Sequence, residues 1–439
     1  MLSSKVVRAL LLGLFCVLAL TFTLTITARA KSKDQDDTIW GRAQKLLQEC
    51  LKSETHDHNA QTPLELVGAI YPPGSNFGGF DIGFNNNNTG QYFVAEGGPN
   101  VNPTPKANPS PGNGAVDVID SVNDVSIGRI TGFYGRYAPG CAGPDGMGPS
   151  GVLVTPDNRL VVDSLVVNGA GTASTGEVFI FDLNSFIPPF NFTVSQATYA
   201  IGTGAACRAD ELAYDPRDHI LIVGDPADTP APSVSFISLE TYSLMNKVSF
   251  PKASGIEQSV WDSELNHGAF ITNVPGVGLV VFNPKTQEIE NTYSVGPTCV
   301  GTGLVLGPFQ KLLVGCTSGG PLQIVNALTG NLIALVPEIP SMDEGWYNPG
   351  DGRFYAPSGT LEQVGVIDAE TNTALTPFPP ARTGVRSVAA DSETDHVFVV
   401  WPPPSPTAVA GTDAAKDPCN TMFSLPANTG CIAVYTHAH

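Results

Sequence analysis

The 439-residue sequence predicts an all-β fold, a seven-bladed β-propeller. The first observation is a repeat in which an apolar stretch, a polar turn and a second apolar stretch follow one another. Its clearest copies occupy residues 208–223, 257–271, 343–356 and 386–400. A repeat of this length and strand content is typical of propeller blades. The second observation is composition: 46 Gly, 37 Pro and only 14% charged residues suit many short strands joined by tight turns.

The turn positions of the seven copies set the length of each blade. They are Asn85, Thr155, Asp215, Asp262, Gly307, Asn348 and Asp391. The gaps between them are 70, 60, 47, 45, 41 and 43 residues, and the last four match a four-stranded blade of about 40–50 residues. The two longest gaps contain insertions at 99–114 and 168–175, which we do not expect to form domains.

Each blade is expected to contain a hairpin whose turn follows an Asp or Asn. These residues are Asp120, Asp182, Asn283, Asn326 and Asp368. Such a side chain accepts hydrogen bonds from backbone amides about two residues further on, and this fixes the turn.

Closure of the ring requires a strand from the N-terminal side. After Asp391 the chain supplies apolar runs at 397–400 and 431–435, which leaves the last blade one strand short. The apolar segment 64–71 precedes the first repeat and can supply the missing outer strand. Sharing one blade between the two ends removes two exposed sheet edges. We therefore expect the propeller to span residues 63–439.

Residues 1–30 have the pattern of a signal peptide. Lys5 and Arg8 precede an apolar run at 9–26, and small residues stand at the cleavage position ending at Ala30. Cleavage there predicts a secreted or periplasmic protein. The run is just long enough to span a bilayer, so an uncleaved anchor is the alternative.

Residues 31–62 are predicted to form a polar tail with a short amphipathic helix, because apolar residues recur at helical spacing between Ile39 and Leu51. The whole chain has a net charge of −19, which becomes −22 without the three basic residues of the signal. Such acidity disfavours nucleic acid and anionic lipid surfaces. After cleavage we expect a monomer without stable membrane insertion.

The cysteines predict structural disulfides rather than a metal centre. Export places them in an oxidising compartment, where nearby pairs close. The expected pairs are Cys419–Cys431, Cys299–Cys316 and Cys141–Cys207, which leaves Cys50 in the tail. No Cys-x-x-Cys zinc pattern is present.

Several stretches resemble bacterial YVTN-type seven-bladed propellers. Blade endings such as Ile-Asp-Ala-Glu-Thr-Asn-Thr at 367–373 are similar to theirs, and 208–219, 257–262 and 344–351 resemble an exported, uncharacterised branch of that group. The resemblance implies the fold and no single reaction, because such propellers include binding proteins and enzymes. Gluconolactonase-type propellers are more distantly similar. They bind a divalent cation through Glu, Asn and Asp, whereas the matching places here hold acids without that Asn.

Polar residues recur at one position of the repeat, just before the innermost strand. Because blades stand radially, the starts of these strands meet at one mouth of the central channel. The candidate ligand-binding residues are Asp81, Arg208, Asp210, Glu211, Glu257, Gln258, Asp343, Glu344 and Arg386. The candidate ligands of a divalent cation such as Ca²⁺ are Asp81, Glu211, Glu257 and Glu344.

These residues leave three interpretations open. The carboxyls can tie blades together, can bind a cation or oxygen-rich ligand, or can act as general acids and bases, because crowding raises their pKa values. The sequence favours an exported binding or scaffold propeller with an unidentified small-molecule or protein partner. The alternative is a metal-dependent, lactonase-like hydrolase. Whether the chain is an enzyme stays open, since no nucleophile elbow, phosphate loop or dinucleotide motif occurs.

Overall fold

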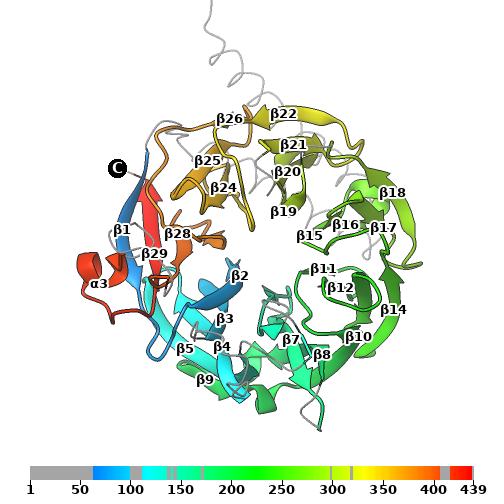
Figure 1. Ribbon diagram of the computed structural model, residues 1–439, viewed down its shortest axis with the longest axis horizontal. Helices are drawn as coiled ribbons and strands as arrows, with labels where there is room; N and C mark the ends of the chain where they lie inside the picture. Colours follow the sequence, from blue (N-terminus) through cyan, green and yellow to red (C-terminus); the bar gives the residue numbers. More distant parts are fainter. Residues whose placement is uncertain are drawn as a thin grey trace, which may run out of the picture. The chain divides into compact units, whose positions relative to one another are not determined.

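The computed structural model describes residues 63–98, 111–135, 140–141, 146–169, 173–296, 299–316, 320–405 and 416–437. The predicted signal peptide, the polar tail and Cys50 lie outside these ranges. Seven sheets are arranged radially around a central channel, as Figure 1 shows. The seven-bladed propeller predicted from the repeat is therefore confirmed.

The blades are numbered in chain order, and within each the strands run from the channel outward. Blade 1 consists of β2 (Gly79–Asn86), β3 (Gln91–Gly98), β4 (Pro111–Asp120), β5 (Val125–Tyr134) and β9 (Phe190–Thr193). Blade 2 consists of β6 (Val152–Val154), β7 (Arg159–Val167), β8 (Ser174–Asp182) and β10 (Tyr199–Ala206). Blade 3 consists of β11 (Leu212–Asp215), β12 (Ile220–Asp225), β13 (Ser233–Ser238) and β14 (Ser243–Ser249). Blade 4 consists of β15 (Ser259–Asp262), β16 (Ala269–Val274), β17 (Gly278–Phe282) and β18 (Ile289–Tyr293).

The remaining blades repeat the same antiparallel order. Blade 5 consists of β19 (Gly301–Leu306), β20 (Lys311–Cys316), β21 (Leu322–Asn326) and β22 (Leu332–Val336). Blade 6 consists of β23 (Trp346–Asn348), β24 (Arg353–Ser358), β25 (Gln363–Asp368) and β26 (Thr373–Ala374). Blade 7 consists of β27 (Val388–Ala390), β28 (Val397–Trp401), β29 (Cys431–His437) and β1 (Leu64–Ile70). The short helical elements are η2 (Leu183–Ser185), η3 (Val194–Gln196), η4 (Leu265–His267), η5 (Pro308–Gln310) and α3 (Pro418–Phe423).

Strand β1 closes the ring as predicted. It pairs antiparallel with β29, in a register that places Leu64 opposite His437 and Ile70 opposite Ile432. Leu64 and Ile70 are buried. The first and last segments of the propeller thus share blade 7, which lies between blades 6 and 1 in Figure 1.

Packing between neighbouring blades forms the core. The buried apolar side chains fall into seven clusters, one for each contact between adjacent blades, in the part of the chain that the structure describes. The strands facing these contacts are buried on both faces, as in Ile220–Asp225 and Ala269–Val274. Each fully buried large apolar side chain stabilises the fold by roughly 1.5–3 kcal/mol.

The predicted turn residues have the expected partners. Asp120 Oδ1 accepts hydrogen bonds from the amides of Val122 and Asn123, at 3.0 and 2.9 Å. Asn283 accepts in the same way from Lys285 and Thr286. Asn326 and Asp368 accept from amides three residues on, and Asp182 from one two residues on. Side-chain acceptors therefore fix the blade turns.

The three predicted disulfides are present: Cys141–Cys207, Cys299–Cys316 and Cys419–Cys431. Strand β9 and the short helical elements of the propeller were not predicted. Strand β9 comes from the chain of blade 2 and pairs in parallel with β5 of blade 1, and α3 lies in the insertion of blade 7. Among the described residues, no helix is both long and apolar enough to span a membrane.

Candidate functional site

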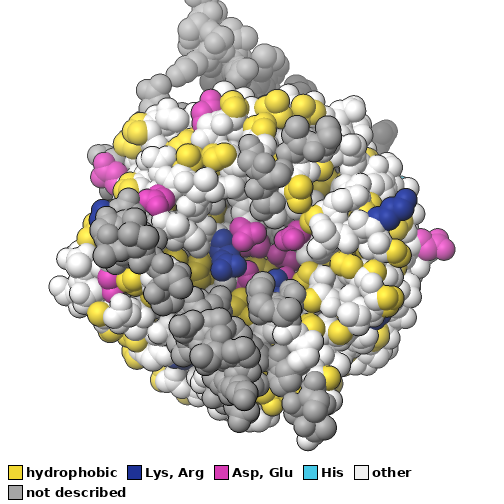
Figure 2. Space-filling view, in the orientation of Figure 1, with side chains coloured by type: hydrophobic (Ala, Val, Ile, Leu, Met, Phe, Trp, Pro, Cys, Tyr) yellow, Lys and Arg dark blue, Asp and Glu magenta, His cyan; other side chains and the backbone are white. Residues whose placement is uncertain are grey.

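The nine candidate residues lie at or just before the starts of innermost strands. Asp81 is in β2 of blade 1, and the others precede the inner strands of blades 3, 4, 6 and 7. Figure 2 shows acidic and basic side chains facing one another at the central opening. We call these nine residues the mouth ring, and they differ in whether their side chains have partners.

Arg208 joins two carboxyls of the mouth ring. Its Nη1 lies 2.6 Å from Asp81 Oδ2, and its Nη2 lies 2.7 Å from Asp210 Oδ2. Nη1 also donates to Ser150 Oγ at 3.2 Å. Asp81 and Asp210 are 8% and 4% exposed, so these ion pairs are largely shielded from water. Arg208 thereby links blade 1 to the segment entering blade 3.

Glu211 of blade 3 and Glu344 of blade 6 form a carboxyl pair across the channel. Both side chains are buried, and a hydrogen bond joins them. Burial raises the pKa of Glu211 well above its ordinary value, and the charge of Glu344 raises it further. Burial also raises the pKa of Glu344 well above its ordinary value, and the hydrogen bond with Glu211 partly opposes that rise. These directions make Glu211 the donor of the hydrogen bond and Glu344 its acceptor.

Backbone contacts complete the ties between blades. Gln258 Oε1 accepts from the amide of Leu304 in blade 5 at 2.8 Å and from that of Gly345 in blade 6 at 3.4 Å. The Glu344 amide donates to the Arg386 carbonyl of blade 7 at 2.9 Å. Five side chains of the mouth ring thus contact other blades, as the blade-tying interpretation expects: Asp81, Arg208, Glu211, Gln258 and Glu344.

Asp163 belongs to the ring but was missed in the sequence. It lies on β7, fully buried, opposite Gly151, whose amide donates to Asp163 Oδ1. A Cβ atom on Gly151 would lie 2.3 Å from Asp163 Oδ2, so this carboxyl fills the place that the glycine leaves. Among the described residues, no donor forms a hydrogen bond with Asp163 Oδ2. Burial, and then the charge of Asp210, raise the pKa of Asp163 well above its ordinary value.

Three charged side chains of the ring have no partner. Glu257, Asp343 and Arg386 are partly exposed, and within the described ranges no hydrogen bond or ion pair engages their side chains. Burial, followed by the charge of Asp343, raises the pKa of Glu257 well above its ordinary value. Burial also raises the pKa of Asp343, whereas Arg386 opposes that rise. Arg386 stacks on Phe80 instead, with its guanidinium carbon 5.1 Å from the ring centre.

The predicted cation ligands are not arranged around one ion. Among the described residues, no group of three or more His, Cys, Asp or Glu side chains could hold a metal. Asp81 forms an ion pair with Arg208, and Glu211 and Glu344 form a hydrogen bond with one another. The residues therefore do not fit a resident Ca²⁺ in this arrangement, and cation binding stays a prediction.

The tryptophans next to the ring have different surroundings. Trp261 packs edge-on against Phe270, and Arg217 lies over it at 5.5 Å, so it fills the contact between blades 3 and 4. The ring centroids of Trp346 in blade 6 and Phe84 in blade 1 lie 5.6 Å apart. The buried Nε1 of Trp346 has no hydrogen-bond partner in the part of the chain that the structure describes. Trp346 and Phe84 follow the ring residues Glu344 and Asp81 along β23 and β2.

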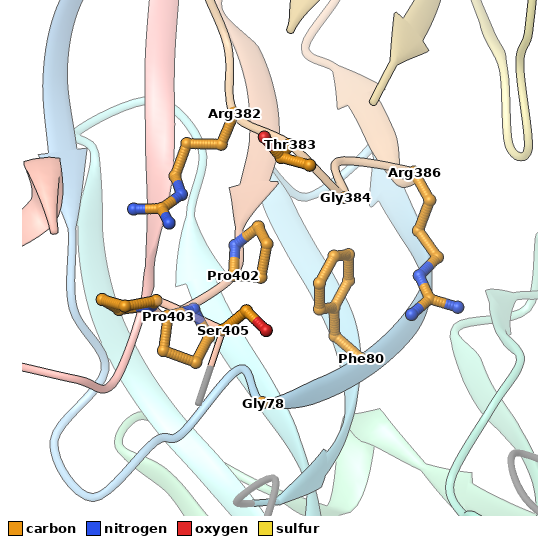
Figure 3. Close-up of a pocket in the computed structure, with 10 residues that line it drawn as sticks. Gly78, Phe80, Arg382, Thr383, Gly384, Arg386, Pro402, Pro403 and Ser405 are labelled. Atoms are coloured by element: carbon orange, nitrogen blue, oxygen red, sulfur yellow. The ribbon is translucent and has the colours of Figure 1, made fainter. Parts of the chain in front are cut away.

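A pocket of about 240 Å³ adjoins the mouth ring and shares Phe80 and Arg386 with it. Its walls come from the starts of β2 and β27 and from the segment after β28. In Figure 3, Arg386 and Phe80 lie side by side at one end, and Arg382 lies at the other end near Pro402 and Pro403.

No model of a known protein family matches this sequence, and no curated protein is similar to it. Any function has to be argued from the site itself.

Proposed function

We propose that the protein is an exported, non-catalytic binding propeller whose mouth ring binds a small ligand through a positively charged ammonium group. With Asp163, the ring holds seven carboxyls and two guanidiniums. Carboxyls therefore outnumber guanidiniums at this opening. A narrow opening lined mainly by one sign of charge concentrates ligands of the opposite sign.

The observation that carries the proposal is the lack of partners for Glu257 and Asp343. Both carboxyls border the channel, are partly exposed, and are engaged by no hydrogen bond or ion pair within the described ranges. The buried Asp163 Oδ2 is a third acceptor without a donor. Buried and half-buried polar groups are usually satisfied, and those that lack partners call for an explanation. An ammonium offers three N–H donors and the opposite charge.

We prefer a binding function to a hydrolytic one because the carboxyls are not arranged as ligands of a metal ion. The lactonase-like alternative needs several carboxyls around one metal ion. Of its predicted ligands, Asp81, Glu211 and Glu344 have other partners, and no group of three or more such side chains that could hold a metal is found among the described residues. The three disulfides support export, since such bonds persist in oxidising compartments. The likeness of the repeat to exported YVTN-type propellers supports the same location.

The test uses cadaverine, a simple diamine, and the mature chain from residue 31. Cadaverine should raise the melting midpoint, by an amount equivalent to about 2.7 kcal/mol at one hundred times its Kd. Glu257→Gln and Asp343→Asn keep the side-chain size and remove the charge. Each should weaken binding by about 1.5–3 kcal/mol, the contribution of one charged hydrogen bond.

Glu288→Gln is the matched control, because Glu288 is exposed on the turn between β17 and β18. It should leave the affinity for cadaverine unchanged. If cadaverine neither binds nor shifts the midpoint of the wild-type protein, the mouth ring is a structural network and the proposed function is wrong.

A further inference from the structure

The pocket beside the mouth ring differs in charge from the rest of the protein. The chain has 41 acidic and 22 basic residues, yet none of the ten residues lining this pocket is acidic and two are arginines. A local excess of positive charge in an acidic protein favours an anionic group at that place.

Arg386 is the arginine of the pocket whose guanidinium forms no hydrogen bond or ion pair with the described residues. Its guanidinium stacks on Phe80. Stacking on the ring fixes the plane of the guanidinium and leaves its edge available. A planar guanidinium matches a carboxylate through two parallel N–H···O bonds. Arg382, at the other end, is held by the carbonyl of Lys416.

Arg386 also lies next to the unpartnered carboxyls. Its carbonyl accepts from the Glu344 amide, which brings Asp343 and Arg386 to adjacent places on blades 6 and 7. Burial raises the pKa of Asp343, and the charge of Arg386 is the largest influence that lowers it, yet the two side chains do not form an ion pair. An unpaired carboxylate and an unpaired guanidinium therefore stand side by side.

We propose that the pocket and the mouth ring together bind a zwitterion, an α-amino acid whose carboxylate pairs with Arg386 and whose ammonium contacts Asp343 and Glu257. This deepens the proposed function and rests on it. A plain anion is disfavoured because Asp343 and Glu257 repel it, whereas the ammonium of the same molecule offsets that repulsion. The volume of about 240 Å³ lies below the ~300–1,000 Å³ of pockets that enclose drug-sized ligands, which suits a small molecule.

The experiment compares three related molecules: L-lysine, cadaverine, which is lysine without its carboxylate group, and hexanoate, which is lysine without its two amines. Their affinities for the mature protein are measured by calorimetry. L-lysine should bind at least about tenfold more tightly than cadaverine, the effect of one added charge-assisted pair. Hexanoate should bind more weakly than either.

Arg386→Gln should abolish the preference for L-lysine, so that the ratio of its affinity to that of cadaverine falls from at least about tenfold to about one. Arg386→Lys keeps the positive charge but not the planar guanidinium that donates two parallel hydrogen bonds. It should therefore recover only part of the lost affinity for L-lysine. Lys252→Gln, at an exposed position away from the pocket, is the control. Melting midpoints without ligand show whether each variant is folded.

The outcomes separate the two proposals. If cadaverine binds wild-type protein as tightly as L-lysine, the ammonium site stands and the zwitterion inference is overturned. Hexanoate binding as tightly as L-lysine also overturns it, because the pocket is then a plain anion site. If no amine binds, the proposed function fails and the inference with it. The wild-type comparison decides the question even if an Arg386 variant does not fold.

Discussion

Replacing Glu211 by Gln tests the charge state of the carboxyl pair that spans the channel. Gln cannot ionise, but its amide still donates a hydrogen bond to the Glu344 carboxylate. Glu211 is buried, and the hydrogen bond to Glu344 is the only one that its side chain forms among the described residues. The substitution therefore mimics the protonated carboxyl and should preserve the fold.

The magnitude follows from the raised pKa of Glu211. In the unfolded chain a Glu titrates near ~4.3. Because the folded state keeps the proton to higher pH, it binds more protons than the unfolded state between those two pKa values. The free energy of unfolding then falls as pH rises, by at most about 1.4 kcal/mol per pH unit for one proton. In Glu211→Gln the free energy of unfolding does not fall in this way. Its difference from wild type should therefore grow in favour of the variant by up to about 2.7 kcal/mol between pH 5 and pH 7.

Urea unfolding of both proteins at several pH values between 5 and 8 measures the difference. Urea is uncharged and leaves the electrostatics unscreened. Other buried carboxyls titrate in this range, since burial raises the pKa of Asp117 to about 6 and that of Asp225 to about 7. Only the difference between variant and wild type is therefore informative. Parallel pH profiles, or a variant less stable than wild type at pH 7, would refute the shared proton. Glu288→Gln should give a profile parallel to wild type.

Two further perturbations test the frame around the site. Replacing Cys299 and Cys316 by Ser opens a disulfide across 17 residues and should cost about 3 kcal/mol, measured as the free energy of unfolding without reductant. A cost near zero would mean that the bond does not restrict the unfolded chain. Deleting residues 63–70 removes β1, exposes the edge of β29 and should cause aggregation, detected by light scattering. Deleting residues 31–60 should change neither scattering nor the melting midpoint, and aggregation of that control would contradict the predicted domain boundary.

Much of the fold could be predicted because the sequence signals of each blade are local. The apolar stretches, the Asp or Asn before each turn and the distance to the next copy all occur within about 45 residues. The disulfides followed from proximity within the repeat. Strand β9 could not be predicted, because it is part of the chain of blade 2 and pairs in parallel with β5 of the blade before it. Its pairing depends on a contact between blades, which local pattern does not contain.

For the site, the sequence by itself determined which acids and arginines share one repeat position, and therefore that they meet at one mouth. Only the tertiary structure decided which of them are paired. Arg208 reaches Asp81 across 127 residues of sequence, and Glu211 meets Glu344 from the opposite side of the ring. Asp163 lies on β7 and fills the space beside Gly151. Comparing equivalent positions of the innermost strands could not identify it, because it belongs to the second strand of its blade. The position of a residue within its blade follows from the repeat. Its hydrogen-bond and ion-pair partners depend on which side chains of other blades come within contact distance in the folded protein.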